Sequence, residues 1–319
     1  MPVNETFSTY SDWTYGAAVG VYVLAMLFSL AELAFGHSAA PARRLVGAGA
    51  PVDEDTVEDT VDTTDGDSTV EPGSRGGRAE RFGRMSVSLI VFGVLLHLSA
   101  LLLRAAATGR VPWGNMYEFG GTLSLAAVVT WLVLLRRFPI RRLSVWLLLP
   151  VTVLMFLGGL VFYTNAAPAG PPLQSYWLAI HVFAVATGSG MVLVPGVVSV
   201  LYLVKVRRPG WAARLPAAEV LDQVAYRTTV FAFPIYTAGV IFGAIWAESA
   251  WGRFWGWDPK ETVAFVAWVV YAAYLHSRAT AGWRGGRAAV INIAGFLVMI
   301  FNLFFINLVV AGLHSYAGV

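Results

Sequence analysis

Cysteine is absent from the 319-residue chain. The chain therefore has no thiolate that could ligate a metal, hold an iron–sulfur cluster or form a disulfide. A thiol–disulfide carrier is excluded for the same reason. If the chain works in a pathway that needs redox thiol chemistry, another protein must supply the thiols.

Charge is also scarce, because only 13% of the residues are charged whereas 57% are hydrophobic. A soluble domain of this size would need far more charge to cover its surface. Apolar runs of roughly 18–25 residues can span a bilayer. They occur at 15–36, 86–106, 117–136, 144–163, 176–204, 229–247, 262–280 and 288–310. The sequence predicts an all-α, polytopic membrane bundle of about eight transmembrane helices.

The positive charges fall on alternate connections between these runs. Of the 22 Lys and Arg residues, all but Arg104, Arg110, Arg253 and Lys260 lie on one side. Because cytoplasmic loops hold the excess of Lys and Arg, we expect a multi-pass protein of the plasma membrane with both termini outside the cytoplasm. The net charge of +3 follows from this topology. Membrane lipid is the expected surrounding, and nucleic acid is not an expected partner.

Three segments are predicted. Residues 1–37 form an N-terminal transmembrane helix, which we expect to be retained because no Lys or Arg precedes its long apolar run. Residues 38–84 form a cytoplasmic acidic loop, predicted to be disordered because its Asp/Thr/Gly-rich part has little apolar surface to bury. Residues 85–319 form the main membrane domain, with an external aromatic loop at 251–261.

The aromatic loop holds three tryptophans in seven positions, Trp251, Trp255 and Trp257. Tryptophan is enriched at membrane interfaces in general, so these side chains could form part of an ordinary interfacial belt. A belt does not require the glycines between them, which let a backbone approach a flat ligand. Asp258 and Pro259 fit the N-cap and first turn of the next helix. Stacking faces beside hydrogen-bonding groups favour a large planar ligand.

The histidines extend this prediction to haem. His181 lies near the outer end of the fifth predicted helix, and His314 follows the eighth at the same membrane level. Two opposed neutral imidazoles bind haem iron well. His276 lies fifteen residues after Glu261, which places it about 22 Å inward along the seventh helix. Ionisable residues at such a depth in the membrane tend to be functional. His97 and His37 are interpreted as packing residues.

Several segments resemble one known family. Trp-Gly-Arg-Phe-Trp-Gly-Trp-Asp-Pro-Lys-Glu-Thr resembles the WWD signature of haem-handling membrane proteins, and in particular of the CcsA (ResC) type of cytochrome c biogenesis protein. Residues 109–118, 173–182, 272–278 and 312–316 resemble further segments of that family in the same order. The resemblance covers roughly residues 86–319, so the first helix and the acidic loop lie outside it.

The resemblance implies a component of a system II cytochrome c synthase that works with a ResB-type (CcsB-type) membrane partner. Such proteins take haem b from the cytoplasmic side and present it externally under the WWD loop. There its vinyl groups are joined to the cysteines of a CXXCH motif in apocytochrome c. A thioredoxin-like reductant, which is another protein, keeps those thiols reduced.

Carried onto this chain, the resemblance makes His181 and His314 the axial ligands of the external haem. With Asp258 they form the catalytic set of a haem lyase that acts by positioning its substrates. His276 would ligate haem in transit, opposite a histidine of the partner, with His97 as a second candidate for that position.

The remaining candidate contacts surround the external haem. Its platform would comprise Trp251, Trp255, Trp257 and Asp258, with Trp177 in the segment before His181. Arg110, Arg253 and Lys260 are the outer cations, and each could pair with a haem propionate or only snorkel at the interface.

Other functions remain open at this point. A haem-delivery protein of the CcmC or CcmF kind shares the aromatic loop, although the Asp-Pro-Lys-Glu-Thr ending favours the CcsA type. An electron-transfer subunit would keep its bis-histidine haem between helix centres and lack an open external groove. A transporter would use Glu32, Glu118 or Glu248 to carry protons, but no internal repeat supports it, and packing or interfacial roles suit these residues better.

Overall fold

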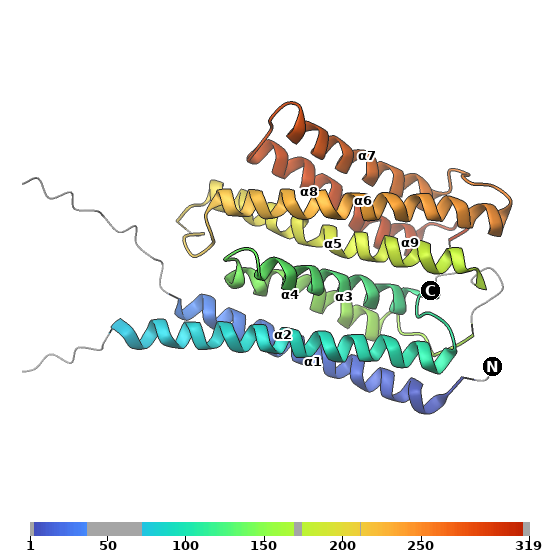
Figure 1. Ribbon diagram of the computed structural model, residues 1–319, viewed down its shortest axis with the longest axis horizontal. Helices are drawn as coiled ribbons and strands as arrows, with labels where there is room; N and C mark the ends of the chain where they lie inside the picture. The colour runs from blue at the N-terminus through green and yellow to red at the C-terminus, as the bar shows by residue number, and fades with distance from the viewer. Residues whose placement is uncertain (1–2, 37–71, 169–173, 211, 315–319) are drawn as a thin grey trace, which may run out of the picture.

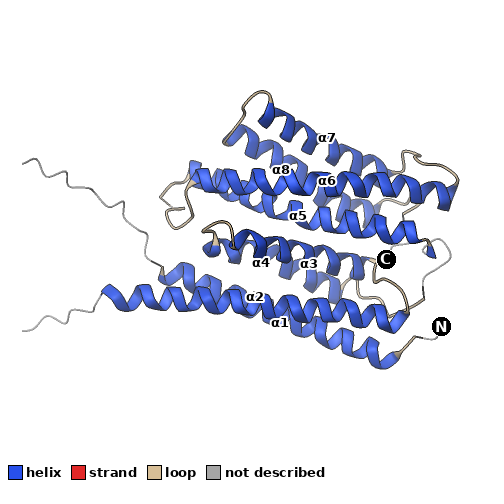
Figure 2. Cartoon of the chain, in the orientation of Figure 1, coloured by secondary structure: helices blue, strands red, loops and turns tan. Residues whose placement is uncertain are grey.

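A computed structural model describes residues 3–36, 72–168, 174–210 and 212–314, and these residues form an all-helical bundle without a strand (Figures 1 and 2). Its eight long helices are α1 (Glu5–Phe35), α2 (Pro72–Thr108), α3 (Met116–Leu135), α4 (Ser144–Leu160), α5 (Tyr176–Arg207), α6 (Ala218–Trp251), α7 (Pro259–Ala279) and α8 (Gly286–Phe301). Short helical turns occur at Arg141–Leu143, Asn302–Ile306 and Asn307–Val309, of which the second is a π-helix.

Seven segments of the described chain are helical, long and apolar enough to cross a membrane. The last of them combines α8 with the two turns that follow it, at Gly286–Val309. Helix α7 is less apolar, but its 21 residues are long enough to span a hydrocarbon core of about 30 Å. It packs against α6 and α8. The predicted polytopic helical membrane bundle is confirmed.

The second helix is longer than its apolar run predicted. Helix α2 begins at Pro72, so the predicted loop 38–84 is wrong for residues 72–84. Tertiary contacts explain the extension: Phe82 packs against Phe28 and Phe35 of α1, and Glu80 pairs with Arg141 at 2.6 Å. Residues 37–71, which include His37 and the acidic stretch, lie outside the described residues.

The bundle is ordered across its width as Figure 1 shows, with α1 and α2 along one edge and α7 at the other. Helix α3 packs against both α4 and α5, and α5 packs along α6. Gly190 of α5 makes the approach to α3 possible, because a Cβ at this position would lie 2.3 Å from the Leu123 carbonyl oxygen. Small residues allow such close contacts between membrane helices.

The two ends of the bundle differ in charge. The connections at 136–140, 208–217 and 280–285 meet at the end shown on the left in Figure 1, and they include five of the chain's arginines. The opposite end holds the start of α1, the loop 252–258 and the last described residues. The charge asymmetry in the sequence is therefore an asymmetry between the two ends of one bundle.

A buried ion cluster fastens α1 and α2 to α3 at the arginine-poor end. The Glu118 side chain is fully buried and accepts hydrogen bonds from Arg104 Nε at 3.1 Å, Arg110 Nη1 at 2.8 Å and the Gly114 amide at 2.8 Å. Arg104, which is 1% exposed, also lies 3.7 Å from Asp12 of α1. Glu118 therefore has the packing role that its place near a helix end suggested.

Replacement of Glu118 by Ala is expected to lower the free energy of unfolding by about 3–5 kcal/mol, because it removes the closer of the two carboxylates that compensate the buried Arg104 charge. Glu80→Ala is the matched control. Its carboxylate also pairs with an arginine but is 51% exposed, so its loss should cost less than about 1 kcal/mol. Unfolding in mixed micelles, followed by circular dichroism, measures both, and equal losses would contradict this view of the cluster.

Candidate functional site

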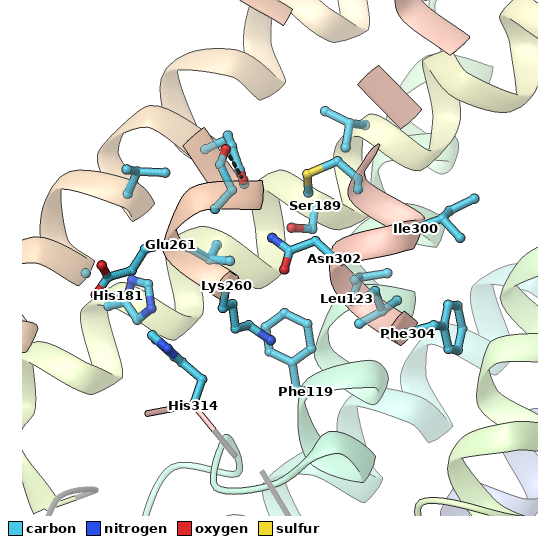
Figure 3. A pocket seen from close by; sticks show the side chains of 18 of the residues that line it. Phe119, Leu123, His181, Ser189, Lys260, Glu261, Ile300, Asn302, Phe304 and His314 are labelled. Carbon is cyan, nitrogen blue, oxygen red and sulfur yellow. Dashed lines mark hydrogen bonds between the residues drawn. The ribbon is translucent and has the colours of Figure 1, made fainter. Parts of the chain in front are cut away.

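A cavity of about 270 Å³ opens between α5, α6, α7 and the end of the described chain. His181 from α5 and His314 from beyond α8 both line it, together with Lys260 and Glu261 from the first turn of α7. Figure 3 shows the two imidazoles beside each other at the cavity wall. The two histidines that the sequence singled out, 133 residues apart in the chain, thus share one site.

The His181 ring is fixed by helix α6. Its Nδ1 lies 2.8 Å from the Gly239 carbonyl oxygen, and because a carbonyl only accepts, Nδ1 must be the donor. The neutral ring therefore has its lone pair on Nε2, as in metal-binding histidines that donate their other nitrogen to a backbone carbonyl. Gly243 leaves space for the ring, since a Cβ at this position would lie 2.7 Å from His181.

The His314 ring is fixed in the same way by Asp258. Nδ1 of His314 lies 2.8 Å from Oδ2 of Asp258, while Oδ1 accepts from the Leu313 amide at 2.8 Å. Asp258 also caps α7 in a capping box with Glu261. One carboxylate thus joins the aromatic loop, the start of α7 and the end of the described chain.

The protonation states of this pair suit a metal ligand. Burial raises the pKa of Asp258, but hydrogen bonds from the Leu313 amide and the His314 ring outweigh it and hold the pKa below its usual value. Burial lowers the pKa of His314 more than the bond to Asp258 raises it. At neutral pH the pair is a carboxylate and a neutral imidazole, with Nδ1 as donor and the lone pair on Nε2.

Trp246 of α6, which sequence reasoning missed, contacts both histidines. Its ring stacks on His181 with centroids 6.0 Å apart and planes 8° apart, and it meets His314 edge-on at 6.2 Å. Trp251 adds an edge contact to His314 at 5.1 Å. Trp246 sits five residues before Trp251, within an apolar run where nothing local marks it as different from a packing residue.

Only some of the tryptophans predicted to form the haem platform line the cavity in the structure. Trp251, Trp255 and Asp258 surround the histidines, and the two tryptophans line the cavity. Trp257 does not line it: the side chain is 67% exposed, and the backbone has a positive φ of 57°. Trp177 packs behind the site, against Phe242 and the cluster around Trp246.

The three predicted cations also differ. Lys260 lines the cavity and donates to the side chain of Asn307. Arg253 pairs with Glu261 at 3.4 Å and lies over the Trp251 ring, outside the cavity lining. Arg110 is held by Glu118 in the buried ion cluster. Of the three, Lys260 alone faces the cavity.

The other described histidines lie elsewhere. His276 is exposed near the arginine-rich end of α7. His97 is fully buried among Tyr15, Tyr22 and α3, and its helix α2 lies across the bundle from α7 (Figure 1). The structure does not bring His97 and His276 together, so the expectation of His97 as a second ligand beside His276 has no support within this chain.

The fold and this site define a multi-pass membrane protein with two oriented imidazoles at one end. The chain belongs to the cytochrome c assembly protein family, whose model matches residues 113–314. Cytochrome c biogenesis protein CcsA of Parasynechococcus marenigrum is 34% identical over 263 residues, covering 72% of this chain and 85% of the relative. CcsA of Chlamydomonas reinhardtii is 34% identical over 244 residues, covering 73% and 69%. These likenesses support the CcsA type.

A solved structure shows a similar fold. The cytochrome c haem lyase CcmF superposes with a TM-score of 0.63 at 17% identity, over 95% of this chain and 47% of CcmF. The chain thus spans less than half of that larger protein. The match reaches beyond residues 113–314, so the first two helices also belong to the shared arrangement.

Asp258→Asn is expected to lower the pKa of His314 further, because the carboxylate that stabilises the imidazolium is gone while the burial remains. Nitrogen NMR of the histidine rings during a pH titration of the ligand-free protein measures this. Asp222→Asn, which removes a carboxylate paired with Arg278 instead, should leave the His314 pKa unchanged. A rise in the pKa of His314 in Asp258→Asn would refute the pairing.

Proposed function

We propose that this membrane component of cytochrome c biogenesis is the haem-presenting part of a cytochrome c synthase. It binds haem b in the two-histidine cavity, on the extracytoplasmic side of the plasma membrane, and promotes its attachment to the CXXCH motif of apocytochrome c. The supporting observation is that both imidazoles line one cavity with Nδ1 donating to a fixed oxygen. Their Nε2 atoms are then the ligands for iron.

The surroundings of the two imidazoles suit a porphyrin. The indoles of Trp246, Trp251 and Trp255 provide flat apolar faces, and Gly243 leaves space for the His181 ring. A cavity of about 270 Å³ lies just below the range of about 300–1,000 Å³ for small-molecule sites. A porphyrin would fill it and extend past its mouth. The two histidines lie near the helix ends, at one wall of a cavity that also reaches Val153, Val192 and Phe296 further along α4, α5 and α8. The position of the histidines favours a haem that leaves over one kept between helix centres for electron transfer.

The chemistry requires positioning more than acid–base groups. Each thioether forms when a cysteine S–H adds across a haem vinyl group, so sulfur bonds to one vinyl carbon and hydrogen to the other. No electron is gained or lost in this addition. Holding the vinyl carbon at the thiol makes the reaction effectively intramolecular. The incoming CXXCH histidine then replaces His181 or His314 on iron, which releases the product.

Two partners are inferred, one from the absence of cysteine and one from the exposed position of His276. Having no cysteine, it depends on a thioredoxin-like protein to keep the apocytochrome thiols reduced. His276 is exposed on α7 near the arginine-rich end, where a histidine of a ResB-type partner can complete a bis-histidine site. Haem taken from the cytoplasmic side would be held there before it reaches the outer cavity.

His181→Ala and His314→Ala should each reduce covalent haem attachment at least about tenfold in cells that co-express a ResB-type partner and an apocytochrome. One iron ligand is lost in each case, and losses at ligand positions are typically of this size or larger. Haem staining of the cytochrome measures the product. Added imidazole should restore part of the activity, and membrane insertion should be unchanged. If both variants attach haem to the cytochrome as well as the unmodified protein does, the proposal is wrong.

Lys260→Met should weaken haem retention in the purified protein by about tenfold or more, because a charge-assisted bond to a propionate contributes about 1.5–3 kcal/mol. Arg110→Gln is the matched control, since Arg110 lies outside the cavity on Glu118. Haem transfer to a competing apoprotein measures both rates of loss. Equal retention by Lys260→Met and the unmodified protein would remove Lys260 from the haem site.

A further inference from the structure

A second cavity, of about 800 Å³, lies at the arginine-rich end of the bundle. Its walls come from α1, α2, the end of α3, the turn at 136–142 and residues 213–216. No histidine of the proposed haem path reaches it. The proposed haem path therefore does not account for this cavity.

The rim of this cavity has an excess of positive charge. Arg136, Arg141, Arg142 and Arg214 line it, against one carboxylate, that of Glu32. Arg141 is neutralised by Glu32 at 2.8 Å and by Glu80 at 2.6 Å. The other three arginines make no ion pair within 4.0 Å with a carboxylate of the described residues. Three guanidinium groups are thus available to an anion.

The wall below the rim is apolar. It is formed by Val87 and Val91 of α2, Leu132 and Leu135 at the end of α3, and Phe138 of the turn. The Val91 side chain is 44% exposed, so the cavity opens sideways on the surface that α2 presents to the membrane. The loop that closes it is held in place by Lys205, which donates to the Ala212 and Leu215 carbonyls at 2.9 and 3.1 Å.

We propose that this cavity binds an anionic phospholipid. Its phosphate pairs with Arg136, Arg142 and Arg214, and an acyl chain lies along Val87 and Val91. Basic pockets between membrane helices recognise anionic headgroups in this way. A free phosphate would leave the apolar wall exposed to water. Haem is disfavoured because no histidine, methionine or tyrosine occurs among the described lining residues to ligate its iron.

The test compares lipid retention in native mass spectra of the full chain, released from nanodiscs of phosphatidylcholine and phosphatidylglycerol. The triple variant Arg136→Gln/Arg142→Gln/Arg214→Gln should bind phosphatidylglycerol on the order of a hundredfold more weakly. Each arginine near an anionic headgroup strengthens binding by about fivefold, and the three factors multiply. Val91→Trp keeps every charge but fills the opening, and it should also lose the bound lipid. The matched control, Arg207→Gln/Arg208→Gln/Arg284→Gln, removes three arginines of the same end that lie outside the cavity.

The site is supported if the control variant retains phosphatidylglycerol while the triple variant and Val91→Trp lose it. The inference is overturned if the control loses as much lipid as the triple variant, because the attraction would then belong to the whole basic surface. It is also overturned if phosphatidylcholine is retained equally well, or if Val91→Trp binds phosphatidylglycerol like the unmodified protein. Saturable binding of haem, with no preference for phosphatidylglycerol, would assign the cavity to a different ligand.

Discussion

The carboxylate of Asp258 is the constraint on which the site depends. It caps α7, accepts from the Leu313 amide and orients the His314 ring, so three segments take their positions from one side chain. His181 is oriented separately, by a carbonyl of α6. Two independent hydrogen bonds therefore aim two imidazoles into one cavity, and the Trp246 ring packs against both of them. In the proposed function, Asp258 is a positioning residue, which would act on haem through His314.

The rest of the bundle keeps this site at one end and most of the arginines at the other. The buried cluster around Glu118 ties α1 and α2 to α3, and close contacts at glycine bring α3 to α5. Arginines gather at the opposite end, where positive charge is favoured on the cytoplasmic side of a membrane.

The sequence was sufficient for those features that depend on hydropathy and charge along the chain. Apolar runs located the helices, and alternating charge separated the two ends. Features that depend on tertiary contacts could not be predicted. The bond between Asp258 and His314 joins residues 56 positions apart, and Trp246 looks like a packing residue in its own run. The start of α2 at Pro72 depends on contacts with α1, and Trp257 turns away because its backbone adopts a left-handed conformation.

The central claim is that His181 and His314 ligate one iron. Low-temperature electron paramagnetic resonance of the ferric haem complex of the purified protein tests it most directly. A low-spin, bis-imidazole spectrum is predicted, with conversion to high-spin iron in His181→Ala and in His314→Ala and a return to low spin when imidazole is added. A low-spin spectrum that survives both substitutions would show that the iron is held by other residues.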